Sequence, residues 1–277
     1  MAGTNDLDSA ISAAGEPISE TEALNRLRQN GDHSHQYYAA WWLGRMRSRH
    51  PEAVPLLQGA LRRRQPREAT SCVEQNAVAR NAARALGKLG DPQAIPDLLS
   101  TMDDDDDGLR EAAARALGEL RAEEAVPLLC QRLASGVTGA GAPQASGNPR
   151  LREPCEAMLE ALGDIGVSDP GVLVVIEPFL AHDRPLIRSA AARALFQLTG
   201  DERWGRRLVE LLAHPQLQVR RAALMDLGAV GWRLALEPIR STLAENSLKL
   251  IALRGLVENG QGPPDTETVL MAMDDLL

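Results

Sequence analysis

The chain is poor in aromatic residues, lysine and cysteine, and it has no long hydrophobic run. No stretch approaches the roughly 20 apolar residues that a membrane-spanning helix needs. The first residues lack the basic and apolar regions of a secretory signal peptide, so we expect a cytoplasmic protein. With a net charge of −8, the chain has little basic surface for nucleic acid. Its 44% hydrophobic and 25% charged residues predict a soluble, folded protein.

Motifs for autonomous catalysis or metal binding are missing as well. The cysteines Cys72, Cys130 and Cys155 are widely spaced and none belongs to a CxxC pair, which predicts reduced, structural thiols. The chain has no phosphate-binding P-loop and no zinc signature. The acidic run DDDDDG (103–108) resembles half of a calcium loop, but Ala114 stands where the bidentate glutamate belongs. We therefore predict an acidic turn between helices and no metal site.

One motif recurs along the chain. Each copy centres on an anchor leucine, and the seven are Leu43, Leu86, Leu117, Leu162, Leu195, Leu227 and Leu256. A second amphipathic segment follows each copy, often with proline in its first turn, where a helix tolerates it. One such helix pair cannot bury its own apolar face, so neighbouring pairs must stack. The sequence therefore predicts an all-α, curved α-solenoid of about six to seven short HEAT-like helix pairs.

The repeats define the organisation of the chain. Residues 19–260 are predicted to form a single repeat domain, with inserted loops at 62–76 and 134–149. Residues 1–18 are predicted to be a flexible N-terminus, and residues 261–277 a C-terminal tail. Ser19 and Glu22 fit a capping box, so we expect a helix over 20–29 that closes the N-terminal end of the array.

The helix that carries the anchor leucine has two distinct faces. Positions −8, −4, 0 and +3 from the anchor are mostly apolar and form the core side, which includes Met46. Positions −6, −2 and +2 lie on the opposite side, and we call them the inner stripe because they should line the concave surface. Arginine is frequent in this stripe, and we weigh a solvated or salt-bridged face equally against a surface for an anionic ligand. Asp226 falls one residue before its anchor, where most other repeats have alanine.

Half of the chain's eight aromatic residues fall within six positions, in HQYYAAWWLGR (35–45). Tyr37, Trp41 and Arg45 fall in the inner stripe, whereas Tyr38 and Trp42 fall on its flanks and are predicted to pack. Two interpretations of Tyr37 and Trp41 stay open. Their rings either stack on a flat ligand or pack against the helix over 20–29.

Three segments in order, YYAAWWLGR (37–45), RNAARALGKLGD (80–91) and NSLKLIALRGL (246–256), carry a resemblance to a known family. Over residues 20–260 the chain resembles the E-type subunits of heterodimeric phycobilin lyases, and most closely those acting on the phycocyanin α subunit. The resemblance implies that the protein, with an F-type partner, attaches phycocyanobilin to a cysteine of that client through a thioether. Phycocyanobilin, an open-chain tetrapyrrole, would be a substrate and not a permanently bound cofactor. The nucleophile would be the client's cysteine.

The resemblance also suggests roles for the inner stripe. Arginines bind the propionates of a bilin through charge-assisted hydrogen bonds, and aromatic rings stack on its pyrroles. The candidate residues for contacts with bilin or client are Tyr37, Trp41, Arg45, Arg80, Arg84, Arg115, Arg193 and Arg254. Glu160, Asp164 and Asp226 are candidate catalytic residues that would contact the pyrrole nitrogens or support protonation of the bilin. The alternatives are a non-catalytic HEAT-repeat scaffold or chaperone for phycobiliprotein assembly, and a lyase for a different bilin or client.

Overall fold

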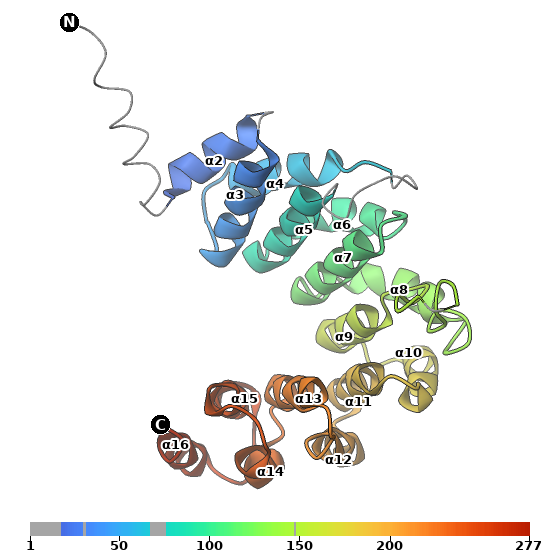
Figure 1. The fold of residues 1–277 in the computed structure, drawn as a ribbon, viewed down its shortest axis with the longest axis vertical. Coiled ribbons are helices and arrows are strands. Elements are labelled where there is room, and N and C mark those ends of the chain that lie inside the picture. Colours follow the sequence, from blue (N-terminus) through green and yellow to red (C-terminus); the bar gives the residue numbers. More distant parts are fainter. Residues whose placement is uncertain (1–17, 30–31, 67–75, 147) are drawn as a thin grey trace, which may run out of the picture.

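The computed structural model describes residues 18–29, 32–66, 76–146 and 148–277, and these residues form an all-helical, curved array (Figure 1). The concave layer consists of α3 (His33–Arg45), α5 (Ala77–Leu89), α7 (Asp107–Glu119), α9 (Cys155–Ile165), α11 (Pro185–Thr199), α13 (Leu217–Val230) and α15 (Asn246–Asn259). The convex layer consists of α4 (Ala53–Arg62), α6 (Ile95–Thr101), α8 (Val126–Leu133), α10 (Pro170–Ile176), α12 (Glu202–Leu211), α14 (Leu236–Ser241) and α16 (Thr266–Asp274). The predicted solenoid of six to seven helix pairs is confirmed, with seven pairs in the described residues.

Short turns separate the helices because the sequence punctuates them clearly. Gly90 ends α5 in the left-handed conformation at φ 74°, which glycine adopts without steric cost. Asp91 then accepts a hydrogen bond from the backbone N–H of Gln93, and Pro92 starts the 3₁₀ turn Pro92–Ala94. Further 3₁₀ turns begin the second helix of two repeats and end that of a third: Glu123–Ala125, Arg233–Ala235 and Glu177–Ala181. The turns are tight enough to place the two helices of a pair antiparallel.

The anchor leucines form the spine of the core. All seven are at most 1% exposed, as their spacing predicted. Fully burying one leucine side chain stabilises the folded chain by about 1.5–3 kcal/mol, so these positions dominate the packing between pairs. Met46 is an exception to the predicted core side, because it lies at the C-cap of α3 and is 60% exposed.

Both ends of the array are closed by a packed helix. At the N-terminal end α2 (Glu20–Arg28) begins at Ser19, whose side chain accepts a hydrogen bond from the N–H of Glu22, and buries Leu24 and Leu27. At the C-terminal end α16 buries Val269 and packs against α15. Residues 261–277, predicted to be a C-terminal tail, thus contain the last helix of the array.

The two inserted segments connect helices of neighbouring repeats. The first runs from α4 to α5, and its residues 67–75 lie outside the described residues, as do residues 1–17 of the N-terminal segment. The second continues past residue 149 to the start of α9 as a series of turns. It packs through Ala140, which is 2% exposed, and through the backbone oxygen of Gly141, 3.0 Å from Nε2 of His182.

Candidate functional site

The predicted inner stripe lies on the concave layer, and its aromatic end is open. Tyr37 and Trp41 on α3 are 44% and 43% exposed. The helix α2 packs through its leucines and does not bury these rings, so the capping interpretation of Tyr37 and Trp41 loses its support. Trp42 is half-buried and packs against the core, as predicted.

Tyr38 differs from its prediction. It was expected to pack on a flank, but it is 42% exposed, and its ring stacks on Trp41 with centroids 5.4 Å apart and planes 26° apart. The reason is that α3 belongs to the first repeat, where no preceding inner helix covers this flank. The stacked pair presents an extended aromatic surface at the end of the concave layer.

Two arginines beside the aromatic pair have no carboxylate partner among the described residues. Arg45 is exposed at the end of α3, and Arg84 on α5 donates only to the side-chain oxygen of Asn81, at 3.3 Å. The two helices approach closely here, because a Cβ added at Gly44 would lie 2.8 Å from Cα of Ala85. Arg45 and Arg84 follow and precede these two contacting residues, so their backbones are neighbours. The surface therefore combines flat rings with uncompensated positive charge.

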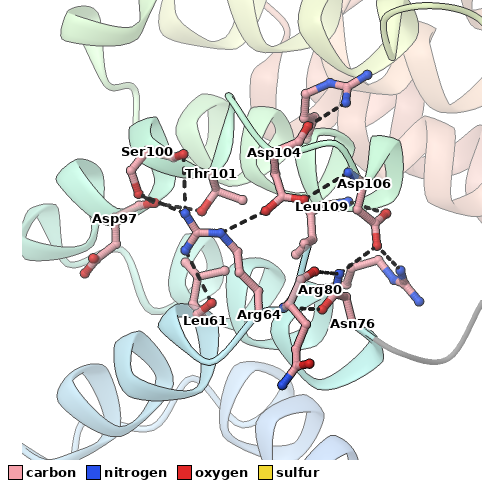
Figure 2. A network of polar contacts seen from close by, with 12 residues as sticks. Leu61, Arg64, Asn76, Arg80, Asp97, Ser100, Thr101, Asp104, Asp106 and Leu109 are labelled. Atoms are coloured by element: carbon pink, nitrogen blue, oxygen red, sulfur yellow. Dashed lines mark hydrogen bonds and ion pairs between the residues drawn. The ribbon is translucent and has the colours of Figure 1, made fainter. Parts of the chain in front are cut away.

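Arg80 is committed to the fold. Its Nη1 donates to Asp106 at 2.8 Å, and Asp106 in turn accepts hydrogen bonds from Asn76 and caps α7 (Figure 2). Arg64 pairs with Asp104 in the same network at 3.1 Å. The acidic run 103–108 is thus an arginine-neutralised turn between helices, as predicted. The described residues contain no cluster of three or more His, Cys, Asp or Glu side chains that could hold a metal ion.

Five predicted residues meet at the middle of the concave layer. Arg115 on α7 contacts Glu111 at 3.4 Å and Glu156 at 3.5 Å, and it also pairs with Glu160 on α9. Arg193 on α11 contacts Asp164 at 2.7 Å and Asp226 on α13 at 3.5 Å. Ser189 donates to Asp226 at 2.5 Å, and Gln197 donates to Asp164 at 2.8 Å. We call these nine side chains the inner-face network.

The inner-face network is acidic overall, with five carboxyl groups against two arginines. Burial raises the pKa of Glu160 to about 7, and Arg115 and Arg193 only partly offset this effect. Burial also raises the pKa of Glu156 and of Asp226, the latter against the charge of Arg193 and the hydrogen bond from Ser189. Glu160 is therefore the carboxyl group best placed to exchange a proton near neutral pH.

Arg254, the remaining candidate, lies apart from both clusters. It is on α15, its side chain is 70% exposed, and it pairs with Glu258 at 2.7 Å within the same helix. A solvated ion pair of this kind contributes little to stability. Apart from Arg80 and Arg254, the predicted residues fall into two groups: an aromatic end with two arginines that have no carboxylate partner among the described residues, and a central acidic network.

Comparison with known proteins identifies the family of this chain. Residues 36–63 match a model of PBS lyase HEAT-like repeats, and residues 68–139 match a model of HEAT repeats. The chain is 51% identical to the bilin biosynthesis protein RpcE of Synechococcus sp. WH8020, over 94% of this chain and 96% of the relative. It is 43% identical to the phycocyanobilin lyase subunit alpha of Synechocystis sp. PCC 6803, over 92% and 95%. This chain belongs to the E-type phycobilin lyase subunits.

A solved structure supports the assignment at the level of the fold. The lyase subunit superposes with a TM-score of 0.84 on a chain in the complex of CpcE and CpcF of phycocyanin lyase from Nostoc sp. PCC7120. The identity is 43%, and the match covers 95% of this chain and 96% of that one. Since the match runs over nearly the whole length of both chains, the full array of repeats belongs to the shared fold.

The described cysteines of this lyase subunit are structural. Cys130 is half-buried, and Cys155 is buried, which raises the pKa of its thiol to about 12. A thiol of that pKa carries almost no thiolate at neutral pH and is a poor nucleophile. Cys72 lies outside the described residues. None of the described helices is long and apolar enough to cross a membrane.

Four members of the inner-face network were absent from the predicted site. They are Glu111, Glu156, Ser189 and Gln197. All four stand at positions −6 or +2 of the inner stripe, so the repeat register carried their signal. Residue type alone did not separate them from solvated polar residues, because the decisive fact is that they converge from neighbouring helices.

Proposed function

We propose that this chain is the E-type subunit of a phycobilin lyase which, with an F-type partner, attaches phycocyanobilin to a cysteine of the phycocyanin α subunit. Its relatives include phycocyanobilin lyase alpha subunits, and a solved relative forms a complex of E-type and F-type chains. The observation that supports this site is the exposed Tyr38–Trp41 stack beside Arg45 and Arg84, which have no carboxylate partner among the described residues. A bilin presents flat conjugated rings and two propionates, which this surface matches in shape and charge.

The reaction needs little chemistry from the protein. The client's thiol adds across a carbon–carbon double bond of the bilin, so that a C–S bond forms, the thiol proton ends on the bilin and no group leaves. A lyase subunit therefore has to hold the bilin, exclude competing conformations and move a proton. We assign the proton to Glu160, with Asp164 and Asp226 as further candidates that hold or accept pyrrole N–H groups.

The aromatic end and the inner-face network are close enough for one bilin to contact both. Arg84 on α5 and Glu160 on α9 have one inner helix between them, and packed helices are about 8–10 Å apart, so the interval is about 16–20 Å. We propose that the bilin lies along the concave layer, with its propionates toward Arg45 and Arg84 and its reactive ring toward Glu160. Arg115 and Arg193 orient the carboxyl groups through the ion pairs described above.

Reconstitution tests the function. Mixing the chain with an F-type partner, phycocyanobilin and apo-phycocyanin α should give a client that stays coloured and zinc-fluorescent after denaturing electrophoresis. Omitting either subunit should abolish the specific adduct. The absence of adduct in the complete mixture, with a folded heterodimer verified by gel filtration, would refute the proposal.

A lyase for another bilin is the second candidate. The observation that favours it is that RpcE, which shares 51% identity with this chain, is named only for bilin biosynthesis, whereas the named phycocyanobilin lyases share 43–47%. The same assay with several bilins decides between them through the absorbance of the product. Tight binding of the apo-client without any bilin binding or adduct would instead support the scaffold or chaperone role.

A further inference from the structure

Consecutive inner helices of this chain are held together by close contacts between small residues. A glycine directly after the anchor leucine meets an alanine of the next inner helix, and the pairs are Gly44 with Ala85, Gly87 with Ala116, Gly118 with Ala161, and Gly163 with Ala194. A Cβ added at any of these glycines would lie 2.7–2.9 Å from Cα of the facing alanine. Backbones this close leave no room for a larger side chain. We call the interface between two consecutive inner helices a joint, and each of these four joints is tightly packed.

One joint breaks this pattern on both sides. In α11 the residue after the anchor leucine is Phe196. In α13 the residue before the anchor, which is the facing alanine at the other four joints, is Asp226. The pattern resumes at the next joint, where a Cβ added at Gly228 would lie 3.0 Å from Cα of Ala252. Between α11 and α13 a bulky ring and a carboxylate replace the glycine and the alanine, so the two backbones cannot approach as the others do.

The packing follows the sequence at this point. Of all neighbouring inner helices, α11 and α13 contact each other least. The buried apolar side chains form two clusters that divide at α11 and α12, and every core residue of α13–α16 in these clusters belongs to the second. Phe196 reaches Trp232 with ring centroids 6.2 Å apart, and the Trp232 ring lies against Gly205 of α12. Aromatic rings thus fill the space that close backbone contact fills elsewhere.

Polar groups at the joint are incompletely satisfied. Among the described residues, four buried side-chain nitrogen or oxygen atoms have no hydrogen-bond partner: Nε of Arg193, Oε1 of Gln197, and Nε1 of Trp204 and Trp232. The side chains of Arg193, Trp204 and Trp232 belong to α11, α12 and the turn after α13, whereas Oε1 of Gln197 faces Gly163 of α9. Buried polar groups are normally paired, and those left unpaired weaken the closed packing relative to a state that hydrates them.

Arg193 links the helices on both sides of α11 through ion pairs. It contacts Asp226 on α13 at 3.5 Å and Asp164 on α9 at 2.7 Å, while Ser189 donates to Asp226 at 2.5 Å. We infer that the α11–α13 joint is a hinge on which α13–α16 move as a unit against α3–α11, with Arg193 and Ser189 forming the latch to Asp226. In a solenoid each repeat contacts only its neighbours, so weakening one joint localises the motion there.

The hinge passes through the inner-face network. Glu160 and Asp164 lie on one side of it and Asp226 lies on the other, so opening the joint separates the candidate catalytic carboxyl groups. That consequence rests on the proposed function, whereas the hinge itself does not. Opening admits a ligand between the two sides, and closing restores the contacts of Arg193.

Distance distributions between spin labels test the hinge on the free, full-length chain. The three native cysteines are replaced by alanine, and nitroxide pairs are placed at exposed convex positions. The pair Val174→Cys and Ser241→Cys joins α10 to α14 across the hinge, and the pair Ser100→Cys and Val174→Cys joins α6 to α10 across unbroken joints. Both pairs span two repeats, and the second is the matched control.

Pulsed EPR should give a distribution about twofold broader for the hinge pair than for the control pair. Asp226→Asn, which weakens the latch, should broaden the hinge pair further and leave the control pair unchanged. The double variant Phe196→Gly and Asp226→Ala restores the small-residue contact and should narrow the hinge pair to the control width.

Equal widths for the two pairs in the otherwise unaltered chain would overturn the hinge, whether or not the variants fold. No lyase activity, bilin or partner enters this measurement, so its failure is distinguishable from failure of the proposed function.

Discussion

Glu160 lies near two arginines and several other carboxyl groups. Together with its burial, this environment sets the pKa of the Glu160 side chain. Burial raises its pKa from the ordinary 4.5 to about 7. The folded state therefore favours the protonated form, and the stability this contributes is fully present below pH 4.5 and is lost as pH rises through about 7.

Replacing Glu160 by glutamine should make stability less sensitive to pH. Because glutamine needs no deprotonation, Glu160→Gln should be on the order of 1–3 kcal/mol more stable than the parent at pH 8 and close to it at pH 4.5. Urea unfolding at a series of pH values measures the difference. Glu258→Gln, at a side chain 53% exposed, is the control and should show no such trend. A constant difference across the range would contradict the raised pKa.

The aromatic end makes a second prediction at the scale of single residues. Trp41→Ala removes a stacking surface worth about 0.5–1.5 kcal/mol, so bilin transfer should fall about 2- to 10-fold. Arg84→Ala should lower transfer through weaker binding of a propionate. Both variants should keep their helicity and their binding to the F-type partner. Met46→Ala, at an exposed apolar side chain at the C-cap of the same helix, is the control and should leave transfer unchanged. Loss of folding in Trp41→Ala would show that the ring is structural.

Residue-level prediction succeeded where the repeat register fixes a position. The register flagged Asp226 because alanine occupies the equivalent place in most repeats, and the structure buries it in a polar contact. The register predicts packing for Tyr38 because the equivalent flank is covered in interior repeats, but the first repeat has no preceding inner helix to cover it. The helical period predicts the direction in which a side chain leaves the helix axis. It does not predict whether a neighbouring element lies in that direction.

At the scale of elements, the acidic turn before α7 has one residue on which the local structure depends. Asp106 caps α7 by accepting from the N–H groups of Gly108 and Leu109, and it also binds Asn76 and Arg80. Loss of a cap and its buried partners should cost Asp106→Ala about 2–3 kcal/mol of unfolding free energy. The matched control is Asp103→Ala, in the same acidic segment 103–108. The Asp103 side chain is 72% exposed, so this substitution should change the unfolding free energy by less than about 0.5 kcal/mol. Equal effects from the two variants would contradict this assignment.

The contacts between inner helices give a second prediction at this scale. A Cβ at Gly87 would lie 2.7 Å from Cα of Ala116, so Gly87→Ala should cost about 1–3 kcal/mol through overpacking. At Gly59 in α4 the nearest atom to an added Cβ is Nη1 of Arg63 at 3.6 Å, so Gly59→Ala should gain up to about 1 kcal/mol from helix propensity. Chemical denaturation compares the two. Stabilisation by both substitutions would show that the inner helices are not in backbone contact.

The whole molecule was the most predictable level. Seven anchor leucines and the turn residues between them specify a stack of helix pairs, and Figure 1 shows the concave layer that they form. The convergence of Glu111, Glu156, Ser189 and Gln197 into one network was not predictable, because it depends on the offset between successive helices. The division of the core at α11 was likewise not predicted, although Phe196 and Asp226 mark it in the sequence.

The central claim is that the concave layer of this chain holds the bilin. Its most direct test is a structure of the chain bound to an F-type partner and phycocyanobilin. The account predicts a tetrapyrrole along the inner helices, with a ring against Trp41, a propionate at Arg45 or Arg84, and Glu160 beside a pyrrole nitrogen. A tetrapyrrole held wholly by the partner, without contact to α3, α5 or α9, would contradict it.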